Sequence, residues 1–171
     1  ARYYYFVPTQ KTASEAIGFA IFSKFPIKNK GEIMFENSFG NGSIFVDLTV
    51  NNQDIRVYNV HLQSISFVKE DYNYLEKVTK EMSVEKSSSK RIVRMLKSAF
   101  QKRAEQVHVM KNHMNNCDIP FVIAGDFNDT PASYAVTKMT DSLNNAFLKK
   151  GSGLGRTYNG KFPNFQIDYI A

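Results

Sequence analysis

Three apolar segments of the sequence carry polar residues at positions where an ordinary core strand would have none. In Ile55–Leu62, Asn59 and His61 share one face, because alternate residues of a strand point to the same side. Both lie near the carboxyl end of the segment. A lone histidine on a strand is commonly a hydrogen-bonded structural residue, whereas its pairing with Asn59 favours a functional role. Both interpretations stay open from this segment alone.

The second polar group follows Phe121–Ala124, a continuous apolar run typical of a strand that is buried on both faces. The run ends in Gly125-Asp126-Phe127-Asn128, which places a carboxylate and an amide at the carboxyl end of the strand. Ligand sites of α/β sheets gather at this edge. The alternative is a plain turn, since Gly, Asp and Asn all favour turns. We assign Asp129 and Thr130 mainly to capping the helix that follows.

The third polar residue is Asp168, which interrupts the apolar segment Phe165–Ile170. Aspartate is disfavoured inside strands, and burial raises its pKa unless a partner stabilises the charge. This carboxylate therefore needs a cation or a hydrogen-bond donor close by. The alternative to a functional role is a salt bridge to a lysine or arginine.

The elements that must position these residues alternate between strands and helices. Ser43–Val50 and Ile55–Leu62 predict a hairpin, and Lys90–Asn115 has apolar residues at helical spacing. The polar, charge-mixed segment Ser66–Ser89 is expected to be irregular or partly helical. The other expected elements are strands at Ala16–Phe22, Gly31–Phe35, Phe121–Ala124 and Phe165–Ile170 and a helix at Ser133–Leu148. This order, without repeats, predicts one α/β domain over residues 1–171 with a mixed sheet.

Composition narrows the class of protein. The 171 residues are 43% hydrophobic, which is enough for one domain with a core, and the single cysteine, Cys117, excludes an internal disulfide and a cysteine-based zinc cluster. The net charge of +6 favours anionic partners such as nucleic acid, phosphorylated metabolites or acidic lipids, although a well-solvated basic surface explains it too. No apolar run reaches the roughly 18 residues of a transmembrane helix, and no signal peptide opens the sequence.

Together, and in this order, the three segments resemble the endonuclease/exonuclease/phosphatase superfamily. Asn59-Val60-His61-Leu62 is similar to its Asn-x-His-Leu segment, Gly125-Asp126-Phe127-Asn128 to its Gly-Asp-x-Asn segment, and Ile167-Asp168-Tyr169-Ile170 to its late Ile-Asp-Tyr strand. Residues 18–27 resemble the strand and turn that precede them. The ordered set is specific, and the resemblance spans essentially the whole chain.

The resemblance implies an α/β fold of two packed mixed β-sheets flanked by helices, a four-layer α/β/β/α sandwich with its site where the strand ends meet. It implies that Asp126 orients or deprotonates the attacking water and that Asn128 holds the nucleophile or a phosphate oxygen. His61, helped by substrate-binding Asn59, would stabilise the charge that develops on a non-bridging oxygen. Asp168 would orient a catalytic histidine, as the carboxylate of a triad does.

A magnesium or manganese ion is the implied cofactor, acting as a Lewis acid on the phosphate and the leaving group. Asp126 and Asn128 are the expected ligands of a second metal site. Arg156-Thr157-Tyr158 resembles a less distinctive family segment, so Arg156 and Tyr158 are expected to contact substrate.

The sequence also departs from the family pattern. The early Asn and metal-binding Glu of the family, and its Ser-Asp-His segment, do not occur here, and Gln166 stands where relatives often have Arg. His108 and His113 lie on the basic helix and are poor substitutes for the catalytic histidine. We therefore expect the central portion of a domain that is incomplete at both termini, with weak Mg²⁺ binding and little hydrolytic activity by itself. Robust Mg²⁺-dependent turnover by the 171-residue chain would contradict this.

The expected function is metal-dependent hydrolysis of phosphate esters. Net charge and the basic helix favour a nuclease or another phosphodiesterase, with nucleic acid as a partner and no obligate protein partner. A phosphatase for lipid-linked or inositol phosphates is the first alternative, and a non-catalytic binding module of the same fold is the second. Some bacterial relatives carry membrane segments ahead of this domain, so the location stays open between the cytoplasm and a membrane tether.

Overall fold

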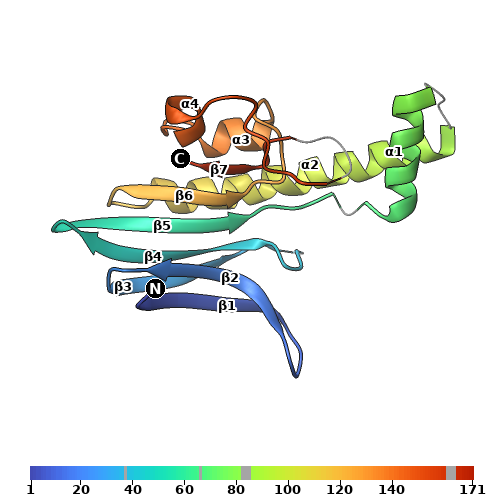
Figure 1. Ribbon diagram of the computed structural model, residues 1–171. Coiled ribbons are helices and arrows are strands. Elements are labelled where there is room, and N and C mark those ends of the chain that lie inside the picture. Colours follow the sequence, from blue (N-terminus) through green and yellow to red (C-terminus); the bar gives the residue numbers. More distant parts are fainter. Residues whose placement is uncertain (37, 66, 82–85, 161–164) are drawn as a thin grey trace.

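The computed structural model describes residues 1–36, 38–65, 67–81, 86–160 and 165–171. Two β-sheets pack against each other, and helices lie over the far side of the larger sheet (Figure 1). The smaller sheet is an antiparallel pair, β1 (Tyr3–Lys11) and β2 (Ala16–Ser23). The expected α/β fold with two packed sheets and helices is thus confirmed.

The larger sheet has five strands in the order β3-β4-β5-β6-β7. It is mixed, because β5 and β6 run parallel while the other neighbouring pairs are antiparallel. The bounds of its strands are Ile27–Met34 for β3, Gly42–Val50 for β4, Gln53–His61 for β5, Phe121–Asp126 for β6 and Asp168–Ile170 for β7. The predicted hairpin is present, as β4 and β5.

Strand β5 separates two apolar cores, as its alternating pattern predicts. Tyr58, Val60 and Leu62 point to the helices and pack with buried residues of the long helix α2 (Lys86–Asn115), including Val107 and Met110. The core between the two sheets is made by Phe19, Ile21, Ile44, Val46 and Leu48, with Val57 of β5 packed against it. Asn59 and His61 therefore face the smaller sheet, away from the helices.

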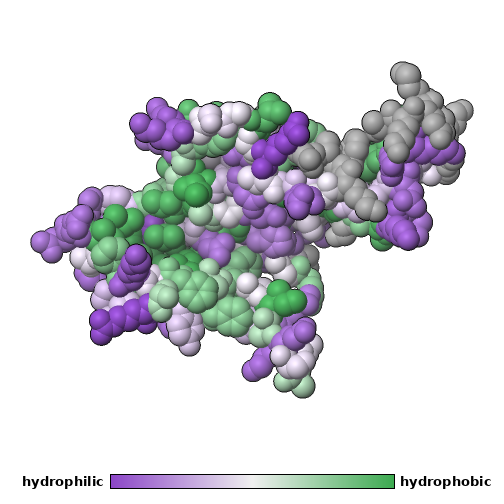
Figure 2. Space-filling model, in the orientation of Figure 1, coloured by the Kyte–Doolittle hydropathy of each residue, from purple (hydrophilic) through white to green (hydrophobic). Residues whose placement is uncertain are grey.

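On the smaller sheet, the side chains that point away from β4 and β5 stay exposed. Phe22 is 69% exposed and Tyr4 is 67% exposed, and their rings lie 6.3 Å apart. Apolar side chains are visible over β1 and β2 in the space-filling view (Figure 2). In the described part of the chain, no helix covers this outer face, so helices are seen on one side of the sandwich only.

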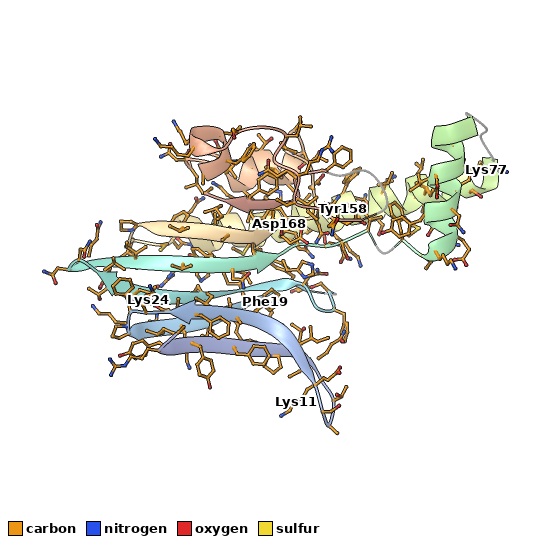
Figure 3. The ribbon with its side chains drawn as sticks, viewed as in Figure 1. Lys11, Phe19, Lys24, Lys77, Tyr158 and Asp168 are labelled. Carbon is orange, nitrogen blue, oxygen red and sulfur yellow. The ribbon has the colours of Figure 1, made fainter. Side chains whose placement is uncertain are left out.

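Residues 69–81 form a regular helix, α1 (Lys69–Glu81), where the sequence predicted an irregular or partly helical segment. The carboxylate of Asp71 accepts a hydrogen bond from the Val68 backbone N–H (3.0 Å) at its start and pairs with Arg91 of α2 (3.2 Å). These tertiary contacts stabilise a segment of low apolar content. Together α1 and the first turns of α2 project beyond the sheets as a helical arm, with Lys77 near its outer end (Figure 3).

The predicted helix over residues 133–148 is two helices, α3 (Tyr134–Met139) and α4 (Ala146–Lys150). Ser142 has a φ of +68°, which no helix tolerates, and the Asn145 side chain caps α4 by accepting from the backbone N–H groups of Phe147 and Leu148. The predicted strand over residues 165–170 is also shorter, because only Asp168–Ile170 pairs with β6. Within the described ranges, none of the helices is both long and apolar enough to cross a membrane.

Candidate active site

Three polar side chains stand in one row across three neighbouring strands. His61 of β5 pairs with Asp126 of β6, and Asp126 pairs with Asp168 of β7. Directly paired residues point to the same face of a sheet, so the row projects toward the smaller sheet. Segments separated by more than 100 residues thus bring an imidazole and two carboxylates together at the end of the sheet.

Gly125 is required for this row. Its φ is +150°, and a Cβ atom there would lie 1.9 Å from the backbone oxygen of Val60 on β5. Only glycine combines this dihedral angle with so close an approach of two backbones. The glycine of Gly125-Asp126-Phe127-Asn128 therefore allows β6 to bring Asp126 beside His61.

A polar cavity of about 520 Å³ opens in front of the row. Asn59, His61 and Asp126 line it together, with Gln63 and Ser64 from the chain after β5. Residues of β1, β2 and the loop before β4 complete its walls. The cavity thus lies between the two sheets, at the position expected for the site.

The Asp126 carboxyl group is set apart by its electrostatic surroundings. Burial raises its pKa, and the negative charge of Asp168 raises it further. The Asn128 backbone N–H, which donates to Asp126 Oδ1 at 2.7 Å, opposes the rise, as do the charges of His61 and Arg103. A carboxylate with a raised pKa is a stronger base than an ordinary aspartate.

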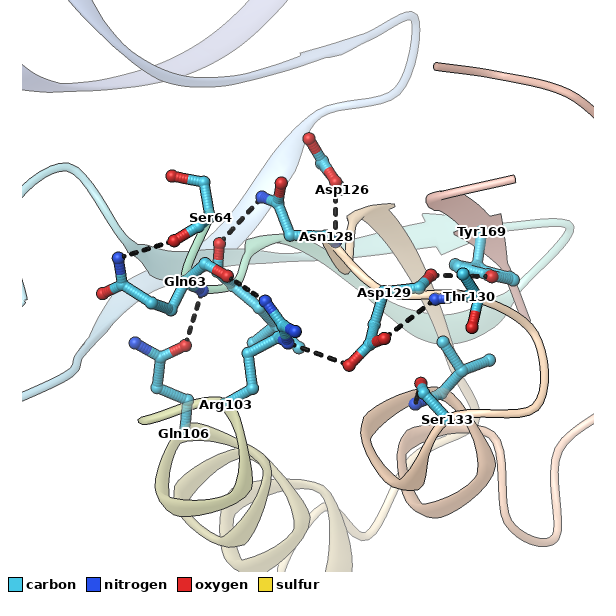
Figure 4. Close-up of polar contacts among 12 residues, drawn as sticks. Gln63, Ser64, Arg103, Gln106, Asp126, Asn128, Asp129, Thr130, Ser133 and Tyr169 are labelled. Atoms are coloured by element: carbon cyan, nitrogen blue, oxygen red, sulfur yellow. Dashed lines mark hydrogen bonds and ion pairs between the residues drawn. The ribbon is translucent and has the colours of Figure 1, made fainter. Parts of the chain in front are cut away.

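Asn128 occupies a tight turn directly after Asp126. Its φ of +51° lies in the left-handed region, which asparagine tolerates better than most residues. Its Nδ2 donates to the Leu62 backbone oxygen at 2.9 Å, which anchors the turn to the end of β5 (Figure 4). Because the amide nitrogen is engaged, the amide oxygen is the atom that can accept a hydrogen bond from a water or bind a cation.

His61 and Asn59 are both held by backbone carbonyl groups. His61 Nδ1 lies 3.0 Å from the Gly40 oxygen, so Nδ1 carries the proton of that contact and Nε2 is left for a ligand. Asn59 Nδ2 donates to the Ala20 oxygen of β2 at 3.0 Å. Asn59 therefore ties the two sheets together, a contact that the sequence did not predict, and its side chain still lines the cavity.

Asp168 lies in the row with an exposed side chain. Its backbone N–H donates to Thr157 Oγ1 at 3.0 Å, and its backbone oxygen accepts from Gln166 Nε2 at 3.3 Å. Within the described residues, the carboxylate forms no salt bridge to lysine or arginine, which was the alternative to a functional role. Through its side-chain contact, Gln166 supports the backbone of Asp168.

Arg103 of α2 is a site-supporting residue that the sequence analysis missed. It is 1% exposed, and its Nε lies 2.9 Å from Asp129 Oδ2 while its Nη1 donates to the Gln63 oxygen at 2.7 Å (Figure 4). Asp129 was predicted to cap the next helix, and this was wrong: the cap of α3 is Ser133, and Asp129 neutralises Arg103. A signal existed, because Arg103 takes a position in the apolar stripe between Ala99 and Val107 where a core residue is expected.

The two remaining predicted residues lie outside the polar cavity. Arg156 is exposed, and among the described residues it lines none of the cavities at the strand ends. Tyr158 lines a different, apolar cavity, where its hydroxyl lies 3.2 Å from that of Tyr72. The structure therefore does not bring these two residues into the row of His61, Asp126 and Asp168.

His113 and His108 contact tyrosines on the helical side of the sheet. His113 Nδ1 lies 2.9 Å from the Tyr58 hydroxyl, and His108 Nε2 lies 3.4 Å from the Tyr134 hydroxyl. Neither lines the polar cavity. Neither can therefore stand in for a catalytic histidine there.

The donor set of the row suits a hard divalent cation. Asp126 and Asn128 offer carboxylate and amide oxygens, and Asp168 adds a second carboxylate whose charge already raises the pKa of Asp126. Mg²⁺ commonly binds through one or two carboxylates and several waters. In the portion of the chain that the structure describes, no three His, Cys, Asp or Glu side chains form a ready metal cluster. The carboxylate and amide oxygens present are thus of the chemical kind that a water-rich Mg²⁺ site uses.

No protein-family model and no curated protein matches the sequence. Solved structures do match the fold. Sphingomyelinase C from Streptomyces griseocarneus is 17% identical with a TM-score of 0.56, and the match covers 94% of this chain and 54% of that one. The human nocturnin catalytic domain, solved with bound sulfate, is 16% identical with a TM-score of 0.59 over 98% and 59% of the chains.

A beta toxin variant from Staphylococcus aureus is 19% identical, with a TM-score of 0.52 over 88% of this chain and 52% of that one. The chain thus spans between half and three fifths of the length of each of these three structures. At such low identities the likeness concerns the fold, and it agrees with the order of motifs in the sequence. The chain has the fold of the endonuclease/exonuclease/phosphatase superfamily.

Proposed function

We propose that the protein hydrolyses phosphate esters with a metal-activated water at the row of His61, Asp126 and Asp168. One observation carries the proposal: two successive register pairs align an imidazole, a carboxylate of raised pKa and a second carboxylate, and the first two of these groups line one cavity. Sphingomyelinase C, which shares the fold, is named for a phosphodiester substrate.

In this proposal Asp126 acts as the general base. Its raised pKa makes the carboxylate a stronger base toward a water than an ordinary aspartate, and Asn128 orients that water through its amide oxygen. His61 donates from Nε2 to a non-bridging phosphate oxygen, since Nδ1 is engaged with Gly40. Asp168 would orient a further catalytic histidine, as the family resemblance implies.

Asp126 and Asn128, with Asp168 nearby, would hold Mg²⁺ or Mn²⁺. When bound, the ion would supply Lewis acidity at the phosphate and the leaving group. Asn59 contributes to substrate binding at most through its amide oxygen, because its nitrogen is bound to β2. Arg156 and Tyr158 would contact only a substrate that extends beyond the polar cavity.

The decisive experiment replaces Asp126 by alanine in the intact natural protein. We expect Asp126→Ala to lower Mg²⁺-dependent hydrolysis of bis(4-nitrophenyl) phosphate by about 10² to 10⁴, the range for loss of a general base. Asn59→Ala should have a milder effect. The thermal unfolding temperature of the Asp126 variant should stay close to that of the parent, because the substitution removes a carboxylate that is repelled by the charge of Asp168.

Asp118→Ala is the matched control, because Asp118 is an exposed aspartate just before the opposite end of β6. Its turnover should equal that of the parent. Unchanged turnover in Asp126→Ala would refute the proposed role. A parallel panel of plasmid nicking and inorganic phosphate release would separate a nuclease or other phosphodiesterase from a phosphatase. Absence of both activities would favour a non-catalytic binding module.

A further inference from the structure

A second cavity, of about 540 Å³, adjoins the polar one. Ser64 lines both cavities, and the Gly125–Asn128 turn contributes Asp126 to the polar cavity and Asn128 to the second. The second cavity lies between the helical arm and the chain that precedes β7. Most of its walls are apolar, with Ile65, Phe67, Leu75, Ile92, Leu96 and Phe100 among the lining residues.

The walls of this apolar cavity are connected to one another. Tyr72 from α1 and Tyr158 from the chain before β7 both line it, and their hydroxyl groups lie 3.2 Å apart. Ile92 is 7% exposed, while Phe100 on the same helix is 50% exposed, so the cavity runs from a buried wall toward solvent. Its volume falls within the range of small-molecule sites, about 300–1,000 Å³.

One polar group in the wall lacks a partner. Arg103 lines the cavity, and its Nη2 is the buried side-chain nitrogen or oxygen without a hydrogen bond among the described residues. The Nε and Nη1 atoms are satisfied by Asp129 and the Gln63 oxygen. Because Asp129 neutralises the guanidinium, this part of the wall carries no net charge.

We propose that the apolar cavity binds the hydrocarbon part of an amphiphilic phosphate ester, with the phosphate group held between Asn128 and His61. This inference rests on the proposed function and names its substrate class. The chemistry favours hydrocarbon over a nucleic-acid strand, which needs unpaired cations along its path. Among the described residues of the wall, Arg103 is the only cation and is already paired, and the exposed basic residues Lys90 and Lys97 of α2 do not line the cavity.

The test measures binding, so that it does not depend on turnover. Decyl phosphate, kept below its micelle concentration, and ethyl phosphate are titrated by isothermal calorimetry at several temperatures. A fully buried methylene strengthens binding by about fourfold. We expect decyl phosphate to bind at least about 100-fold more tightly than ethyl phosphate, with the negative heat-capacity change that marks apolar burial.

Two variants alter the cavity in opposite ways. Leu96→Trp fills the cavity, whereas Phe100→Ser removes part of its wall. Because Phe100 is already half-exposed, its replacement should be tolerated and provides a second test if Leu96→Trp does not fold. Each variant should weaken the binding of decyl phosphate about tenfold or more and leave the affinity for ethyl phosphate unchanged. Leu148→Trp, at an 80% exposed position on α4, is the matched control and should change neither affinity.

Equal affinities for the two phosphates, or decyl phosphate binding that both folded variants leave unchanged, would overturn the proposal. So would an oligonucleotide that binds more tightly than decyl phosphate and is displaced by Leu96→Trp, since the cavity would then hold nucleic acid. Binding is measured without turnover, so failure of the hydrolysis experiment does not affect the interpretation of this result. Loss of binding here, in turn, leaves the catalytic proposal standing.

Discussion

Two arginine–aspartate pairs support opposite ends of the five-stranded sheet, and they differ in how completely their polar atoms are satisfied. At the start of β5, Arg56 binds Asp47 through Nε at 2.6 Å and Nη2 at 2.8 Å, and its guanidinium lies 4.1 Å from the centre of the Phe45 ring. At the other end, Arg103 binds Asp129 through Nε, and its Nη2 has no hydrogen-bond partner in the part of the chain that the structure describes.

The difference separates a structural end of the sheet from the end that carries the candidate site. Around Asp47, hydrogen bonds from Arg56 and Asn29 lower the pKa of the carboxyl group, as expected for a fully satisfied ion pair. Around Asp126, burial and Asp168 raise the pKa of a carboxyl group. Native structures seldom leave buried polar groups unsatisfied, and the exceptions are concentrated where a ligand can bind.

The largest effect on stability should come from the less satisfied pair. Arg103→Met leaves the Asp129 carboxylate buried without its partner and removes the bond to Gln63, so we expect a loss of about 3–5 kcal/mol in the free energy of unfolding in urea. Lys102→Met, next to it on the exposed face, should have almost no effect. The double variant Arg103→Met/Asp129→Leu should recover most of the loss. If Arg103→Met lowers the free energy of unfolding by less than about 1 kcal/mol, the Arg103–Asp129 pair does not stabilise the structure around the site.

A smaller loss is expected at the satisfied pair. Asp47→Asn weakens two charge-assisted hydrogen bonds and should lower the free energy of unfolding at pH 7 by about 2 kcal/mol. Asp54→Asn, in the exposed pair with Lys28, should cost less. If Asp47→Asn lowers the free energy of unfolding no more than Asp54→Asn does, the Arg56–Asp47 pair would be no more stabilising than the exposed Lys28–Asp54 pair.

The Arg56–Asp47 pair also predicts how the stability of the protein changes at acidic pH. The folded-state pKa of Asp47 lies below its ordinary value of 3.8, so its contribution is complete above that value and is lost as the pH falls through the folded-state pKa. The gap in unfolding free energy between the parent and Asp47→Asn should therefore narrow below about pH 3.8. A gap that stays constant into strong acid would contradict the assigned cause.

The smallest effect concerns His113, which packs between Tyr58 and Phe45. Burial, and secondarily the charge of Arg56, lower its pKa below the ordinary value of 6.5. The unfolded chain then binds this proton more readily, so stability should decrease as the pH falls below about 6.5. His113→Gln should remove that part of the pH dependence of urea unfolding, and exposed His108→Gln should leave it in place. An identical pH profile for the His113 variant would contradict the prediction.

The sequence by itself determined most of the architecture and the order of the polar segments. The alternation in Ile55–Leu62 correctly separated Asn59 and His61 from the helix-facing Tyr58 and Val60, because a strand has a period of two. Gly125 was likewise recognised from the sequence as part of the Gly-Asp-x-Asn segment. Local pattern left the extent of α1 open, where Asp71 pairs with Arg91 of α2. It missed the break between α3 and α4, where Ser142 has a positive φ.

Only the tertiary structure decided which atoms of the candidate site are available. Register pairs placed His61, Asp126 and Asp168 in one row, and backbone carbonyls on other elements engaged one nitrogen each of His61 and Asn59. Arg103, charged within an apolar stripe, could be recognised as a support for the site only once Asp129 lay beside it. Periodicity along a chain sets the face on which a side chain lies, whereas its partners come from segments that meet only when the sheets and helices pack.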